Sequence, residues 1–219
     1  MDFKELQRLV RQGEGDTLEF KRKVAHPEKI IREAVAFANT KGGDLLIGVD
    51  DNGSIPGVKY ADEEIFVLNK ALFTLCKPKL KFSYDIIPLD EDDNKAVVHY
   101  TIEESRKKLH YALPDREAEK GIAYVRSADK SIKASREVRR IIKLSQRKSN
   151  RAFSIEDKEK MLLEYLDQHK HITLSEFQQL SKLNRFKASQ ILITLTLSGI
   201  IEVQPSDKED IYSLSSSSY

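Results

Sequence analysis

The order of apolar and polar positions divides the chain into short helices and strands. Apolar residues at helical spacing predict helices over residues 3–12, 27–39, 65–75 and 135–144. Alternating or continuous apolar runs rich in β-formers predict strands over residues 17–21, 45–49, 80–89, 96–102 and 122–126. Helices mixed with paired strands in this way indicate an α+β domain.

Turn and capping residues set the ends of these elements. Pro27 is suited to the first turn of a helix, and Gly42 follows the end of that helix as a C-cap. Asp51-Asn52-Gly53 after an apolar run predicts a hairpin turn, which would put Asp51 at a strand end. Ser135 is a natural N-cap for the helix that begins after it.

A second module follows a polar, charged stretch over residues 145–151, where we place a linker. Beyond it the pattern predicts three helices, over residues 155–169, 174–183 and 185–198, and then a hairpin over residues 200–203 and 211–214. Three helices and a hairpin at this spacing are typical of a winged helix. The predicted domains are therefore residues 1–146 and a small winged-helix-like domain over residues 152–214.

Composition narrows the setting of the protein. The 219 residues are 40% hydrophobic and 33% charged, which is ordinary for a soluble protein. No apolar run approaches the roughly 18 residues of a membrane span, and the N-terminal helix lacks the apolar stretch of a signal peptide. The single cysteine, Cys76, excludes an internal disulfide. We expect a cytoplasmic protein with no membrane partner.

Charge is unevenly distributed although the net value is only +2. Residues 101–150 carry 14 Lys and Arg against 7 Asp and Glu, whereas residues 151–219 carry 8 against 10. A basic segment beside acidic residues is a footprint for a phosphate backbone, of RNA or of DNA. The alternative is a solvated helix face, and it stays open for Arg136, Arg139, Arg140 and Lys143.

Three acids, Glu14, Glu19 and Asp51, are candidates for a metal site. With no His or Cys nearby they suit a hard cation, Mg²⁺ or Mn²⁺. Residues two apart on a strand share a face, so Glu19 and Lys21 would point together into a surface groove while their neighbours face the core. The simpler alternative makes Glu19 an ion-pair partner of Lys21 or Lys23, and Asp51 a turn residue without function.

Two segments, GEGDTLEFKRK and AFANTKGGDLLIGVDDNGSIPG, resemble the Schlafen/AlbA-type DNA-binding domain. The resemblance runs from about Leu6 to Leu144, is weak in the middle, and picks up again at KKLHYALPDREAEKGIAYVRSADKSIKASREVRRII. It implies nucleic-acid binding. In the Schlafen branch it also implies a metal-dependent endoribonuclease whose catalytic acids fall on Glu14, Glu19 and Asp51. Beside them we expect Lys21 to neutralise charge that develops on the phosphate.

The element around Tyr124-Val125-Arg126 resembles the YVR-x-G-S-x-x-x-K-A segment of the same domain and departs from it at Ala128-Asp129. Two cations of this element, Arg126 and Lys133, could contact backbone phosphates. The predicted nucleic-acid-binding residues of this domain are Lys23, Arg106, Lys107, Lys108, Arg126 and Lys133. The order of Gly42-Gly43 and the following strand is wrong for a P-loop, so no ATP is expected.

The winged-helix-like module offers a separate function. Arg185 and Lys187 fall near the start of its third helix, where base edges are usually met, yet its hairpin turn is acidic. Acidic residues repel phosphate, so dimerisation is an equal alternative to DNA reading. The leading hypothesis is an endoribonuclease dependent on Mg²⁺ or Mn²⁺. A non-catalytic DNA-binding regulator and a homodimerising module are the competitors.

Overall fold

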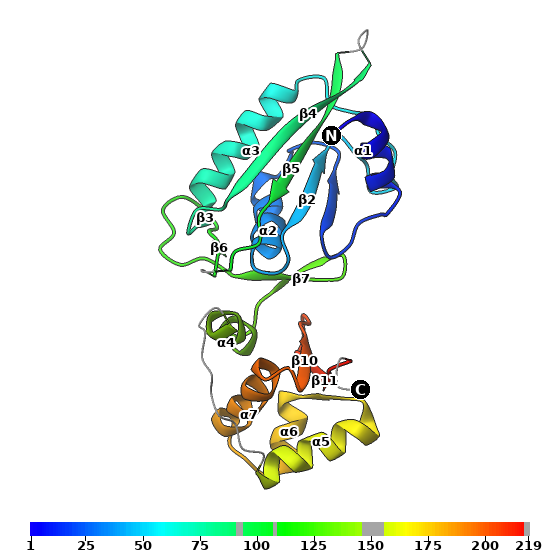
Figure 1. Ribbon diagram of the computed structural model, residues 1–219. Helices are drawn as coiled ribbons and strands as arrows, with labels where there is room; N and C mark the ends of the chain where they lie inside the picture. The colour runs from blue at the N-terminus through cyan, green and yellow to red at the C-terminus, as the bar shows by residue number, and fades with distance from the viewer. Residues whose placement is uncertain (91–93, 107–108, 146–155, 217–219) are drawn as a thin grey trace. The chain divides into compact units, whose positions relative to one another are not determined.

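The computed structural model describes residues 1–90, 94–106, 109–145 and 156–216 (Figure 1). The chain divides into two compact units, Met1–Lys133 and Ala134–Tyr219, which we call unit 1 and unit 2. Within the described residues no helix is long and apolar enough to cross a membrane.

Unit 1 is built on a four-stranded sheet in the order β1-β2-β5-β4. Its strands are β1 (Leu18–Lys21), β2 (Gly43–Ile47), β4 (Phe82–Asp90) and β5 (Lys95–Ile102). β1 and β2 are parallel, whereas β5 is antiparallel to both of its neighbours. The predicted pairing of the strands now seen as β4 and β5 is confirmed.

Helices cover both faces of this sheet. The helices are α1 (Phe3–Val10), α2 (Pro27–Ala38) and α3 (Ala61–Leu75). On one face, Leu6 and Val10 of α1 pack in a cluster with Leu18 and Phe20 of β1. On the other face α2 and α3 build the larger core, and α3 runs alongside β4 (Figure 1). Both faces of β1 are therefore covered, which the alternating pattern alone did not predict.

Two short pairings complete unit 1: β3 (Cys76–Lys77) with β6 (Tyr111–Ala112), and β7 (Tyr124–Ser127) with β8 (Lys130–Lys133). Asn39, at the end of α2, ties them to the core. Its Nδ2 donates to the carbonyl oxygens of His110 at 3.0 Å and Tyr124 at 2.9 Å, and its Oδ1 accepts from the His110 N–H at 2.8 Å. The Asn of the AFANT motif is thus a structural residue.

The predicted hairpin at Asp51-Asn52-Gly53 is wrong. A turn is present, with the Gly53 N–H donating to the Asp50 carbonyl at 2.8 Å. The chain beyond it does not pair with β2, because β1 and β5 already occupy both edges of that strand. Asp51 therefore lies in a loop four residues past the end of β2.

Unit 2 contains the helices and the hairpin that the sequence predicted for its C-terminal part. The elements are α4 (Arg136–Ser145), α5 (Asp157–His169), β9 (His171–Thr173), α6 (Leu174–Ser181), α7 (Arg185–Leu197), β10 (Ile201–Gln204) and β11 (Ile211–Leu214). The strands form an antiparallel sheet in the order β10-β11-β9. β9 was not predicted, because three residues are too few to show a period. The winged-helix assignment stays a prediction.

The predicted linker follows α4, whereas the division between the units precedes it. The reason is a contact between α4 and α7: the buried Glu137 accepts a hydrogen bond from Ser189 Oγ at 2.8 Å. At the start of α4, Ser135 Oγ accepts from the Val138 N–H at 3.0 Å, which confirms the predicted N-cap. Residues 146–155, which hold most of the predicted linker, lie outside the described residues.

Candidate nucleic-acid site

Four charged side chains meet on the α2 side of the sheet in unit 1. Glu19 and Lys21 are paired in register with Leu45 and Ile47 of β2. The side chains of Leu45 and Ile47 belong to the larger core, which α2 and α3 build. Glu33 of α2 and Arg126 of β7 reach them from two other elements. We call Glu19, Lys21, Glu33 and Arg126 the ion-pair cluster. Its members come from three elements, so their meeting depends on the whole fold.

Glu19 does not line an open groove. Only 6% of the residue is exposed, and Arg126 of the β7–β8 hairpin contacts its carboxylate directly. Its two carboxylate oxygens have cationic partners: Oε1 accepts from Lys21 Nζ, and Oε2 accepts from Arg126 Nη1 at 2.8 Å. The alternative of an ion pair with Lys21 therefore describes this side chain better than a surface acid does.

Arg126 is an internal residue, in contrast to its predicted role on a phosphate. It is 4% exposed, and it donates to the Gly15 carbonyl at 2.5 Å and to Ser131 Oγ at 3.2 Å. Its guanidinium also lies 4.8 Å from the centre of the Phe37 ring. Its Nε is buried without a hydrogen-bond partner among the described residues, and its other contacts join β7 to β1 and to α2.

Lys21 is shared between two acids. Its Nζ donates to Glu19 and to the Phe20 carbonyl at 2.8 Å, and lies 3.3 Å from Glu33 Oε1. Burial on its own would lower the Lys21 pKa, but the carboxylates of Glu33 and Glu19 more than offset it, and the pKa is raised. The ammonium is therefore firmly charged, and the Lys21 side chain is partly buried, with 24% exposed.

The fourth member of the cluster, Glu33, was not predicted from the sequence. Burial first, and then the charge of Glu19, raise the pKa of Glu33 to about 7, although Lys21 opposes the shift. Its Oε2 is buried without a hydrogen-bond partner among the described residues. A signal was available, because Glu33 falls at the i+3 position of the apolar stripe Ile30, Ala34 and Phe37.

Glu14 lies beside this cluster. Its Oε1 accepts from the Phe20 N–H at 2.8 Å. The pKa of Glu14 is raised, mainly by burial and in smaller part by the neighbouring Glu19 carboxyl. Two of the three predicted metal ligands are therefore adjacent.

Asp51 is the third predicted ligand. It is exposed and lines a shallow groove of about 460 Å³ together with Gly13 and Phe20. Within the part of the chain that the structure describes, no three His, Cys, Asp or Glu side chains are arranged to hold a metal ion. Since both oxygens of Glu19 are also engaged by cations, the residues as placed do not fit a divalent ion.

The AFANTKGG motif is explained by packing. Gly42 has φ +74°, and a Cβ there would lie 2.8 Å from the Ile102 carbonyl oxygen. At Gly43 a Cβ would lie 2.6 Å from the Phe37 ring. Thr40 Oγ1 accepts from the Arg126 N–H at 3.1 Å. The motif therefore holds α2, β2 and β7 together, and the predicted C-cap role of Gly42 fits its geometry.

The remaining predicted cations are placed separately. Lys23 and Lys133 of unit 1 are exposed, as are Arg185 and Lys187 in the first turn of α7 in unit 2. Arg106 is exposed and forms a surface ion pair with Glu104 at 3.4 Å. Lys107 and Lys108 lie outside the described residues.

Comparison with known proteins identifies unit 1. No curated protein matches the chain. Among solved structures, the DIP2311 protein from Corynebacterium diphtheriae is similar at 18% identity and a TM-score of 0.40, over 56% of this chain and 25% of that one. The family described as Schlafen, AlbA_2 matches residues 14–135, and this family suggests nucleic-acid binding. Because the match covers more than half of the 219 residues, the chain belongs to the Schlafen, AlbA_2 family.

Proposed function

We propose that unit 1 binds RNA through exposed lysines on the elements that the ion-pair cluster holds together. Lys23 comes two residues after the end of β1, and Lys133 ends β8. The Glu19–Arg126 ion pair, at 2.8 Å, joins β1 to the β7–β8 hairpin and fixes both lysines to one framework. This ion pair is the observation that carries the proposal.

Lysines of this kind act on the phosphate backbone. Each phosphate that a lysine neutralises releases a counterion, so affinity falls as salt rises. Contacts to phosphates do not distinguish one base from another, so RNA binding is expected to depend on charge and to tolerate changes in RNA sequence.

The test is fluorescence anisotropy with a labelled RNA hairpin and a labelled DNA duplex, in EDTA. Lys23→Gln and Lys133→Gln should each weaken RNA binding at low salt, whereas Lys4→Gln, an exposed lysine of α1, serves as the matched control. If the three variants and the wild-type protein bind equally well, the RNA surface lies elsewhere. If duplex DNA binds and RNA does not, the substrate class is wrong.

Metal-dependent RNA cleavage is the second candidate, and it is favoured by the adjacency of Glu14 and Glu19. A bound Mg²⁺ or Mn²⁺ would polarise a phosphate and lower the pKa of an attacking water. Since the present placement does not fit such an ion, cleavage requires Glu19 to give up a cationic partner and Asp51 to join it. The experiment is incubation of structured RNA with and without Mn²⁺. Intact RNA with the metal supplied contradicts this candidate.

DNA reading by unit 2 is the third candidate, supported by the exposure of Arg185 and Lys187 at the start of α7. The double variant Arg185→Gln/Lys187→Gln should then lose duplex DNA binding and keep RNA binding. Equal DNA binding by this variant and the wild-type protein contradicts a reader helix at this position.

A further inference from the structure

Three aromatic side chains are exposed on the surface formed by α3 and β4 of unit 1. The exposed fractions are 67% for Phe66, 55% for Phe73 and 43% for Tyr84. We call these residues the aromatic face. Phe66 and Phe73 are seven residues apart on α3, which places them on the same side of the helix, two turns apart. Large exposed rings gathered in this way are uncommon on a surface with no ligand.

The rings are supported by the core beneath them. Phe73 lies 5.8 Å from the ring of Phe82, and Tyr84 lies 5.4 Å from the buried Tyr100, measured between ring centres. Phe82 and Tyr100 are themselves 6.0 Å apart. Phe73 and Tyr84 are therefore anchored on a continuous aromatic layer, so a ligand that stacks on Phe73 need not order that ring first.

Lysines lie beside two of the three rings of the aromatic face. Residues 65–84 contain four lysines and no Asp or Glu. Lys70 Nζ lies 5.7 Å from the centre of the Phe66 ring, and Lys79 Nζ lies 5.8 Å from that of Phe73. A third lysine, Lys81, is mostly exposed and is paired at 3.7 Å with Glu103. Each exposed ring of α3 thus has an ammonium beside it.

We propose that the aromatic face binds single-stranded nucleic acid, with bases stacked on Phe66 and Phe73 and phosphates close to Lys70 and Lys79. Stacking rings combined with cations are the features that unstructured RNA and DNA recognise without regard to sequence. The ammonium groups beside Phe66 and Phe73 favour a polyanion. A protein partner fits less well, since lysine is depleted in protein–protein interfaces.

This surface is separate from the ion-pair cluster. β4 is at one edge of the sheet and β1 is at the other. The inference rests on nucleic-acid binding by unit 1 but on neither Lys23 nor a metal ion. It adds single-strand recognition to the phosphate contacts proposed above.

The chain contains no tryptophan, so one introduced indole reports on this surface alone. In the Phe66→Trp variant of the full chain, titration with oligo(U) or oligo(dT) in EDTA should quench the indole fluorescence and reach saturation. Stacking is worth about 1–3 kcal/mol per base, so Phe66→Ala should weaken binding about 5-fold or more. Adding Phe73→Ala should weaken it further.

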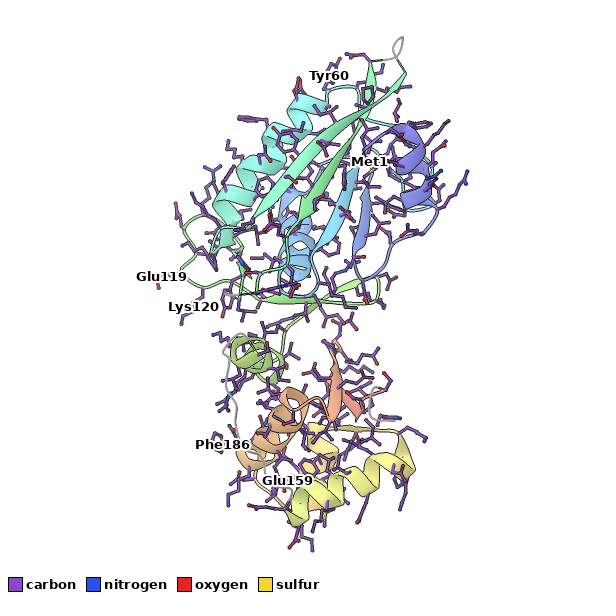
Figure 2. The ribbon with its side chains drawn as sticks, viewed as in Figure 1. Met1, Tyr60, Glu119, Lys120, Glu159 and Phe186 are labelled. Carbon is purple, nitrogen blue, oxygen red and sulfur yellow. The ribbon has the colours of Figure 1, made fainter. Side chains whose placement is uncertain are left out.

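Tyr60→Ala is the matched control. Tyr60 is as exposed as Phe66, at 67%, and projects near the start of α3 (Figure 2), where Asp62, Glu63 and Glu64 make the surroundings acidic. The affinity of the Tyr60→Ala variant for the oligonucleotide should equal that of the wild-type protein. Because Phe73 contacts Phe82, Phe66→Ala is the variant least able to disturb folding.

Unchanged indole fluorescence on titration, or wild-type affinity in Phe66→Ala, overturns the proposal. A fluorescence change with protein concentration alone, without oligonucleotide, also overturns it and makes a second copy of the chain the occupant. If Lys23→Gln and Lys133→Gln bind normally while the indole is quenched, the function proposed above fails and the aromatic face stands.

Discussion

Replacing Arg126 by Gln should destabilise the protein strongly, because Arg126 is the buried ion-pair partner of Glu19. The Arg126 side chain is 1% exposed and that of Glu19 is 8% exposed, so the change leaves a carboxylate buried without its main partner. Breaking a buried ion pair from one side costs about 3–5 kcal/mol. Lys21 still contacts Glu19, which moderates the loss, so we expect about 3 kcal/mol, or more than 100-fold in the folding constant.

The measurement is urea unfolding of the full chain followed by circular dichroism. Lys133→Gln, an exposed lysine at the end of β8, is the control and should change the free energy of unfolding by no more than about 0.5 kcal/mol. The double variant Glu19→Gln/Arg126→Gln should lose less than the sum of the two single variants, because each single change already breaks the pair. This coupling separates an ion pair from two independent residues.

A different pattern would refute the reasoning. If Arg126→Gln loses less than about 1 kcal/mol of stability and much of its RNA affinity, Arg126 is a phosphate ligand and the buried pair is not its main role.

Three further outcomes are expected. Because the folded-state pKa of Glu33, about 7, lies above its ordinary value of 4.5, the free energy of unfolding should fall as pH rises from about 4.5 to 7 and level off above. Urea unfolding at pH 5 and pH 8 measures this dependence. Glu33→Gln should remove the fall in the free energy of unfolding and should be more stable than the wild-type protein at pH 8. An unchanged pH dependence in this variant would contradict the assignment. Asn39→Ala removes three hydrogen bonds to the backbone of His110 and Tyr124 and should cost about 3 kcal/mol, while a loss below 1 kcal/mol would show that other groups replace the amide. If RNA is cleaved, Glu14→Gln should abolish cleavage without unfolding, since an amide oxygen can still accept from the Phe20 N–H, and full activity would remove Glu14 from the chemistry.

The parts of the fold that follow from local signals were predictable. Helical spacing and caps gave α1, α2 and α7 to within a few residues, and the apolar runs gave the β4–β5 pair. The hairpin predicted at Asp51-Asn52-Gly53 was wrong, because turn residues do not show whether the preceding strand has an unpaired edge for the next segment. That edge was closed by β1, a parallel partner reached through α2.

The candidate site was less predictable because its contacts are distant in sequence. Glu19 and Arg126 are separated by 107 residues. The strand pattern predicted that Arg126 would be exposed, and it could not show that the carboxylate of Glu19 contacts the guanidinium. Burial of Glu19 had the same cause, since Arg126 of β7 lies against a side chain that alternation placed on a polar face. The sequence singled out Glu19, Lys21 and Arg126 and missed Glu33, and it could not show which of these charges neutralise one another.

Salt dependence tests the central claim most directly, namely that exposed lysines of unit 1 bind the RNA backbone while Arg126 stays inside. The affinity of the full chain for a labelled RNA is measured between about 50 and 200 mM salt. The logarithm of the association constant should fall linearly with the logarithm of the salt concentration, and the double variant Lys23→Gln/Lys133→Gln should have a slope smaller by roughly 1.4–1.8. An unchanged slope in that variant, or no RNA binding at the lowest salt, would contradict the account.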